Sequence, residues 1–283
     1  MIKLLFLVLC SALPVLADAF ADYWYAGKAE VAVYDLQQSR YGENRPGTAT
    51  LIFVTEPFSR QKHVKLDAPD QAGADRATVL KLNTMKKYNT GIYPYSVMSS
   101  AFTDLSSGAL YKATTSIQEW CGHTFTQANL VRPNRYRYQG FSYFENAGDQ
   151  DIELNDTQLT EALLLELRLG RLTTDTTALP LVPSQEMIRT LHISPAACPA
   201  TLSWDVTPSI TTLTVRYEHD SDLRLEITFD TAFPHCIQRW EEAYTRGGQR
   251  HVTAATLKTV QRLPYWEMNS TNHDHWRGKV GLE

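Results

Sequence analysis

Several features that would classify this sequence at once are scarce or missing. Glycine and proline account for only 14 and 13 of the 283 residues, so the chain is neither collagen-like nor low in complexity. The 27 basic and 31 acidic residues nearly balance, which leaves no strongly basic surface for non-specific binding of nucleic acid. Charged residues make up 20% and apolar residues 43% of the chain. These proportions exclude a disordered chain and allow a substantial hydrophobic core.

Long hydrophobic runs are also missing, except at the N-terminus. Lys3 supplies a positive charge, residues 4–16 are almost entirely apolar, and small residues follow. This order is typical of a secretory signal peptide, and the run is shorter than the roughly 20 residues that span a bilayer. We expect a signal peptide over residues 1–19, with cleavage after Ala21 as the alternative to cleavage after Ala19. The mature chain is then exported to the periplasm or beyond and has no transmembrane segment.

Export would place the remaining cysteines in an oxidising environment. Removal of the signal peptide leaves Cys121, Cys198 and Cys236, which is an odd number. A disulfide between Cys198 and Cys236 would close a long loop and stabilise the fold by about 4 kcal/mol in the chain-entropy description. We expect this pairing, which leaves Cys121 unpaired. Other pairings stay open, because a sequence does not fix disulfide connectivity.

Alternation of apolar and polar residues predicts a mainly β protein. Residues 223–230 alternate without exception, and a polar turn joins them to a strand over residues 212–218, which predicts a hairpin. Residues 50–54 are apolar on both faces, so we expect their strand to be covered on both sides. Because strands follow one another without intervening helices, the sheet should be antiparallel. Further strands are predicted over residues 29–34, 48–56, 79–85, 110–119, 124–130, 136–145 and 252–259.

One segment has the features of a buried helix. Strong helix formers follow a polar N-cap, and Gly170 provides a stop signal. Leucines occupy most of the circumference, so this helix should be buried rather than lie on a surface. We therefore expect a large curved antiparallel sheet, or half-barrel, around one buried helix at about 157–169. Residues 20–283 would form a single β-rich domain, with 20–155 and 210–283 as possible lobes joined by the helix and a Pro-rich connection.

Glu119, Cys121 and His123 form the sharpest cluster with chemical potential. A cysteine nucleophile needs a nearby base to form the thiolate, and a carboxylate can orient that base. However, Gly122 predicts a bulge or a turn at this point, and a buried thiol beside the packed ring of Trp120 is the more typical arrangement. A thiol-dependent hydrolase centred on Cys121 and His123 is therefore the alternative interpretation.

Aromatic residues and an arginine indicate a ligand-binding surface. Tyr93 and Tyr95 share one face of a strand, and Pro94 cannot donate to a ladder, which predicts a sheet edge or a bulge. These two tyrosines and Trp120 are candidates for lining a cavity, and Arg137 is a candidate for meeting an anionic head group. Packing at a barrel rim and an ordinary polar strand face are the structural alternatives.

Two further groups are expected to be structural. His273 and His275 flank Asp274 with a spacing that suits a metal, but no third ligand is evident, which favours a solvated tail. Glu241 and Glu242 are adjacent on a predicted strand and so face opposite ways, which predicts ordinary surface charge. The sequence therefore indicates no metal site and no cofactor.

A distinctive set of segments comprises Tyr23–Glu30, Tyr88–Ser96, Gln118–His123, Arg239–Glu242, Ala255–Lys258 and Tyr265–Trp266. Together they resemble a family of exported bacterial proteins that are frequently labelled septum formation inhibitor. The resemblance covers nearly the whole mature chain. It implies an exported protein of unknown biochemical role, and it carries over no catalytic residues.

These observations favour an exported, soluble, non-enzymatic protein. Its curved sheet would hold a lipid or another hydrophobic or amphiphilic small molecule, or would dock a cell-envelope protein. Binding would bury apolar ligand surface in a preformed concavity, and a few polar groups would set the orientation. An open apolar cavity would support this expectation, whereas a sheet filled by the Leu-rich helix would count against it.

Overall fold

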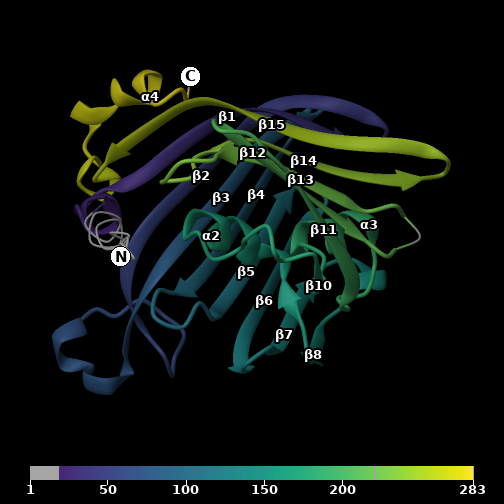
Figure 1. The fold of residues 1–283 in the computed structure, drawn as a ribbon. Helices are drawn as coiled ribbons and strands as arrows, with labels where there is room; N and C mark the ends of the chain where they lie inside the picture. Colours follow the sequence, from purple (N-terminus) through teal and green to yellow (C-terminus); the bar gives the residue numbers. More distant parts are fainter. Residues whose placement is uncertain (1–18, 220, 283) are drawn as a thin grey trace, which may run out of the picture.

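The computed structural model describes residues 19–219 and 221–282, and most of its regular structure belongs to one β-sheet (Figure 1). The predicted signal peptide lies outside the described residues except for Ala19. Fifteen strands pair in the order β8-β7-β6-β5-β4-β3-β2-β1-β15-β14-β13-β12-β11-β10-β9. Neighbouring strands are antiparallel except for β9 and β10, which are parallel. The expectation of a mainly β fold with one large curved antiparallel sheet is thus confirmed.

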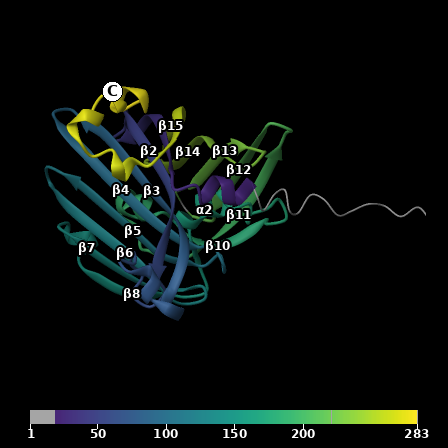
Figure 2. The ribbon, with the colours of Figure 1, turned by 90° about the vertical axis from the view of Figure 1, so that its left-hand side faces the viewer.

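Two meanders build this sheet, and the first and last strands of the chain join them by lying side by side. The first meander contains β1 (Ala29–Arg40), β2 (Glu43–Ser59), β3 (Arg76–Thr90), β4 (Tyr93–Asp104), β5 (Leu110–Glu119), β6 (Gly122–Arg132), β7 (Arg135–Ser142) and β8 (Gln150–Leu154). The second contains β9 (Gln158–Leu159), β10 (Ala178–Val182), β11 (Cys198–Val206), β12 (Ile210–Tyr217), β13 (Arg224–Asp230), β14 (Ile237–Arg246) and β15 (Gln249–Leu263). Figure 2 shows the two meanders on either side of the central helix.

The strand that is apolar on both faces is β2, as predicted. Leu51 and Phe53 point into the main core, whereas Val54 lies on the outer face of the sheet. The C-terminal segment, which includes α4 (Trp276–Lys279), covers that outer face, and its Val280 is buried there (Figure 1). The C-terminal segment is therefore held on the sheet through Val280, while Asp274 and His275 are exposed, as the sequence predicted for solvated residues.

The predicted buried helix is shorter than the sequence indicated. Only Leu163–Arg168 is α-helical (α2), because η4 (Thr160–Ala162) is a 3-10 turn and β9 pairs with β10. The burial is confirmed, since three leucines of α2 are buried inside the curve of the sheet. Gly170 has a φ of 63°, a left-handed conformation that ends the helix as expected.

A second helix, α3 (Gln185–Leu191), lies within the predicted Pro-rich connection. The hydroxyl of Ser184 caps it by accepting a hydrogen bond from the backbone N–H of Met187 at 3.2 Å. Ile188 and Leu191 are buried in the main core, so α3 also lies within the half-barrel. None of the helices in the described part of the chain is long and apolar enough to cross a membrane.

A buried ion pair ties α2 to β1. The side chains of Arg168 and Glu30 are 0% and 1% exposed, and two N–O contacts of 2.5 Å join them. The Nε of Arg168 also donates to the carbonyl oxygen of Pro234 at 2.8 Å. The rings of Trp24 and Phe53 lie 5.1 and 4.5 Å from the guanidinium carbon. These contacts fix the position of α2 against the sheet.

The expected disulfide is not formed, because Cys121, Cys198 and Cys236 are all free thiols. Cys198 begins β11, whereas Cys236 directly precedes β14, three strands away in the sheet. Adjacent strands are about 4.8 Å apart, so these positions lie beyond the roughly 7 Å between Cα atoms that a disulfide can bridge. Spacing along the chain did not reveal this separation.

Candidate functional site

A cavity of about 420 Å³ opens at one edge of the half-barrel, between the turns of several hairpins and the C-terminal end of α3. Its volume falls within the range of about 300–1,000 Å³ that is typical of small-molecule sites. We call it the mouth cavity. Its lining includes Arg40, Arg189, Arg246, His192, His251, Tyr41, Phe144, Tyr244, Glu119 and Cys121.

Two half-buried arginines dominate the mouth cavity. The guanidinium of Arg40 lies 4.4 Å from the ring centroid of Tyr41 and 5.5 Å from that of Tyr95, and it donates to both hydroxyls at 3.4 Å. The guanidinium of Arg189 lies 3.9 Å from the ring centroid of Phe144. Within the described residues, neither arginine forms an ion pair with a carboxylate, and the Nε of each is buried without a hydrogen-bond partner. Both guanidiniums therefore keep unused donors.

The electrostatics of the cavity follow from this clustering of positive charge. Burial and the neighbouring charge of Arg40 lower the pKa of Arg189. Burial and the nearby arginines also lower the pKa of His192, which leaves that ring neutral at neutral pH. Glu119 is the one acidic residue in the described lining, and its carboxylate accepts a hydrogen bond from the backbone N–H of Cys121 at 2.6 Å. The cavity is thus locally cationic in a protein of formal net charge -4, which favours an anionic ligand.

The structure brings the three predicted aromatic candidates together at the rim of the mouth cavity. The ring of Tyr93 lies 6.1 Å from the ring of Trp120 and 5.9 Å from that of Tyr95, centroid to centroid. The hydroxyl of Tyr95 lies 2.9 Å from the hydroxyl of Tyr41, which lines the cavity. Tyr95 is only 4% exposed and lines the narrow space behind the mouth cavity, whereas Trp120 is 68% exposed; none of the three lines the mouth cavity itself.

Arg137 and the segment around Pro94 do not lie where the sequence predicted. Arg137 is exposed on β7, where its guanidinium pairs with the carboxylate of Asp151 at 2.5 Å, and it does not line the mouth cavity. The segment around Pro94 is not at a sheet edge, because β4 pairs with β3 and β5. Pairing with β5 begins only at Ser96, so the missing N–H of Pro94 is tolerated.

The predicted Cys–His cluster forms the tight hairpin between β5 and β6. Glu119 pairs with Gly122 across the turn, which confirms the turn predicted from this glycine. The Nε2 of His123 lies 2.9 Å from the hydroxyl of Ser116, and no hydrogen bond in the described residues joins it to Cys121. A hydrogen bond to Glu119 and its negative charge raise the pKa of the Cys121 thiol. A nucleophilic thiol needs the opposite shift, so this geometry does not favour a thiol hydrolase.

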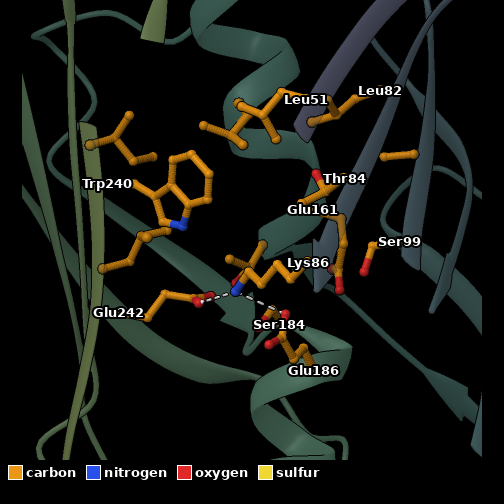
Figure 3. Close-up of a pocket in the computed structure, with 15 residues that line it drawn as sticks. Leu51, Leu82, Thr84, Lys86, Ser99, Glu161, Ser184, Glu186, Trp240 and Glu242 are labelled. Carbon is orange, nitrogen blue, oxygen red and sulfur yellow. Dashed lines mark hydrogen bonds and ion pairs between the residues drawn. The ribbon is translucent and has the colours of Figure 1, made fainter. Parts of the chain in front are cut away.

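Deeper in the half-barrel, a cavity of about 90 Å³ surrounds a buried lysine (Figure 3). The Nζ of Lys86 lies 3.0 Å from a carboxylate oxygen of Glu186 and 2.8 Å from one of Glu242, so it links β3, α3 and β14. Glu242 shares the inward face of β14 with Trp240, and its prediction as surface charge was wrong. We call this space the inner cavity.

Glu161 is a further acidic residue of the inner cavity (Figure 3). Its carboxylate accepts a hydrogen bond from the backbone N–H of Gln185 at 2.7 Å. Burial raises its pKa from 4.5 to about 7, despite that hydrogen bond. The carboxyl is therefore partly protonated at neutral pH, which moderates the negative charge around Lys86.

Only a narrow space separates the mouth cavity from the inner cavity. It measures about 10 Å³, and its lining includes Arg40, Arg189 and Glu186. A space of this size holds at most about one water molecule. The interior is therefore not the open apolar cavity that a long hydrophobic ligand would need, and ligand-sized room exists at the mouth.

The arginines of the mouth cavity were not predicted from the sequence. Arg40 and Arg246 stand at strand ends directly before glycine-containing turns, and Arg189 belongs to the unpredicted α3. The turns of an antiparallel meander alternate between the two edges of the sheet. Combining each turn signal with the strand order would have placed Arg40, Arg246 and Trp120 at the same edge.

No protein-family model and no curated protein matches the chain. Among solved structures, a β-barrel-like protein of domain of unknown function DUF1849 from Brucella abortus aligns with 83% of this chain and 97% of its own, at 10% identity and a TM-score of 0.47. A DUF1089 family protein from Pseudomonas aeruginosa aligns with 56% of this chain and 82% of its own, at 8% identity and a TM-score of 0.36.

Proposed function

We propose that this protein is an exported, non-enzymatic binding protein that holds an anionic amphiphile in the mouth cavity. The observation that carries the proposal is the pair Arg40 and Arg189, which line a ligand-sized cavity without a carboxylate partner in the described residues. Partly burying a charge without a partner is costly. An anionic group of a ligand would supply the missing acceptor and would form charge-assisted hydrogen bonds with both guanidiniums.

The aromatic part of the lining suits the apolar portion of such a ligand. Tyr41, Phe144 and Tyr244 contribute ring surface to the mouth cavity, and Trp120 is exposed at its rim. A few charged groups set against apolar surface are typical of sites that orient a small molecule. The narrow space behind the mouth favours a ligand with a short chain or a ring over one with a long acyl chain.

Export is part of the proposal and rests on the sequence pattern of residues 1–19. Binding is favoured over a thiol-dependent hydrolase because His123 pairs with Ser116 rather than with Cys121, and because Glu119 raises the pKa of the Cys121 thiol. Cell fractionation followed by mass spectrometry of the mature chain tests the export. A chain that keeps its first residues and stays in the cytosol would contradict it.

Isothermal titration calorimetry with two amphiphiles of equal chain length tests the binding. We expect decyl phosphate to bind below its micelle concentration and the uncharged decyl glucoside to bind much more weakly. Hydrogen bonds between charged groups contribute about 1.5–3 kcal/mol. Arg189→Gln and Arg40→Gln should therefore each weaken the binding of decyl phosphate by at least about tenfold.

Arg132→Gln is the matched control, because the substitution removes the same charge from an exposed residue. Arg132 ends β6, at the edge of the sheet opposite the mouth cavity. It should leave the affinity unchanged, and circular dichroism would establish that all variants are folded. Equal affinity for both amphiphiles, or equal effects of Arg189→Gln and Arg132→Gln, would show that the mouth cavity is not an anion site.

A further inference from the structure

The edge of the sheet that holds the mouth cavity also exposes large apolar side chains at successive turns. Tyr41 lies in the β1–β2 turn, Ile92 in the β3–β4 turn, Trp120 in the β5–β6 turn, and Tyr143 directly follows β7. Their exposed fractions are 59%, 86%, 68% and 74%. Because these turns alternate with those of the opposite edge, all four side chains lie along one edge. We call this set the apolar rim.

Contacts hold the apolar rim in place. The ring of Trp120 stacks on that of Tyr93, with centroids 6.1 Å apart, and the hydroxyl of Tyr41 contacts that of Tyr95 at 2.9 Å. The ring of Tyr143 covers the backbone of the β5–β6 hairpin, where a Cβ placed at Gly122 would come within 2.8 Å of it. These exposed rings are therefore positioned by packing, although most of their surface faces solvent.

The apolar rim flanks a cationic hollow on the side of the first meander. Arg40, Arg189 and Arg246 line the mouth cavity, and Glu119 is the one acidic group in its described lining. Tyrosine and tryptophan rings prefer the headgroup level of a bilayer, and arginines near the surface are attracted to anionic lipids. A protein partner would need one matching protrusion to fill the hollow, whereas individual lipid headgroups can enter it separately.

We propose that the apolar rim docks this protein onto the surface of a lipid bilayer that contains anionic headgroups, with the mouth cavity facing the lipids. Ile92, Tyr143 and Trp120, the three most exposed side chains of the apolar rim, enter the interfacial region. The arginines of the mouth then face the phosphates. This surface goes beyond the proposed function, because docking requires only lipid headgroups and no particular ligand.

Co-sedimentation with vesicles tests the docking. The full-length mature protein should sediment with vesicles of equal parts phosphatidylglycerol and phosphatidylcholine, and much less with pure phosphatidylcholine. The double variant Ile92→Ser, Tyr143→Ser removes apolar surface and replaces no residue that lines the mouth cavity, and it should weaken binding roughly tenfold. The matched control Val64→Ser, Val206→Ser changes exposed apolar residues away from this edge and should bind like the unaltered protein.

Fluorescence reports the orientation independently. Acyl chains brominated near the headgroup should quench a component of the tryptophan emission, and Trp120→Phe should abolish that component. Equal vesicle binding by the rim variant and the control, or quenching that survives Trp120→Phe, would overturn the docking surface. Failure of the unaltered protein to bind either vesicle would do the same, but it would leave the decyl phosphate measurement intact, since that measurement uses no vesicles.

Discussion

Replacing Glu30 with glutamine tests what holds α2 inside the half-barrel. The carboxylate of Glu30 accepts two hydrogen bonds from Arg168 at 2.5 Å and one from the hydroxyl of Tyr23. Glutamine keeps the shape and one acceptor oxygen, but it removes the only negative charge that pairs with Arg168 in the described residues. The guanidinium cannot move to water, because its side chain is 0% exposed.

The expected loss of stability is large because a buried charge would be left unpaired. Removing one partner of a buried ion pair costs about 3–5 kcal/mol. Glu241→Gln is the matched control, since Glu241 pairs with Arg239 at 2.5 Å but with side chains that are 30% and 41% exposed. An exposed pair of this kind contributes only about 0–1 kcal/mol. The two substitutions make the same chemical change, so their difference isolates the effect of burial.

The pH dependence gives a second test of the same pair. Burial alone would raise the pKa of Glu30, but the charge of Arg168 and the hydrogen bonds outweigh it and hold the pKa below its ordinary value. A carboxyl with a lowered folded-state pKa stabilises the protein above its unfolded pKa, and this contribution is lost as the pH falls through the folded value. The loss of stability caused by Glu30→Gln should therefore be fully present at neutral pH. It should become smaller as the pH falls below about 4, the ordinary pKa range of a carboxyl group.

Urea unfolding followed by circular dichroism measures both effects through the midpoint and the slope. We expect the midpoint of Glu30→Gln to fall far more than that of Glu241→Gln, with unchanged slopes. Equal shifts for the two variants, or a deficit of Glu30→Gln that is the same at pH 7 and pH 3, would refute the assigned role of the ion pair.

Three further substitutions address other parts of the molecule. Burial raises the pKa of Glu161 from 4.5 to about 7, so its contribution to stability is complete below the unfolded pKa and is lost as the pH rises through 7. Between pH 4 and pH 8, Glu161→Gln should therefore gain about 3 kcal/mol of unfolding free energy relative to the unaltered protein. Urea unfolding measures this, and a difference that does not change with pH would contradict it. Because Glu119 raises the pKa of Cys121, Glu119→Gln should speed iodoacetamide labelling of Cys121 at pH 8 several-fold, and an unchanged rate would show that the carboxylate does not act on the thiol. A Cβ added at Gly47 would lie 2.3 Å from a backbone oxygen of β3, so Gly47→Ala should cost about 1–3 kcal/mol, whereas Gly148→Ala, whose Cβ meets nothing closer than 3.6 Å, should cost much less in the same unfolding assay.

The strands were predictable because their pattern depends on immediate neighbours. Alternation over residues 223–230 specified β13, and two-sided hydrophobicity specified the covered part of β2. The start of the central helix was not predictable in this way. β9 forms by pairing with β10, a partner some distance along the chain, and this pairing removes residues that a local pattern assigns to the helix.

The sequence indicated the neighbourhood of the candidate site but not its lining. Tyr93 and Tyr95 share a strand face and Trp120 stands at a turn, and these local signals predicted all three as cavity-lining residues. The structure places them beside the mouth cavity and outside its lining. Arg40 and Arg189 come together only through the curvature of the sheet and the position of α3 inside it. No local pattern contains that geometry, which explains why the sequence favoured Arg137 as the anion-binding candidate.

The environments of the arginines show which of them serves the fold and which is available to a ligand. Arg168 is fully buried and pairs with Glu30, and the exposed Arg137 pairs with Asp151. Arg40 and Arg189 are half-buried, yet in the described residues they contact aromatic rings and no carboxylate within ion-pair distance. Stability alone would favour a neutral side chain or an added acidic partner at those two positions, because a partly desolvated cation without a partner is unfavourable. Two such cations on one ligand-sized cavity are therefore the reason why we propose that a negative charge from outside the chain binds there.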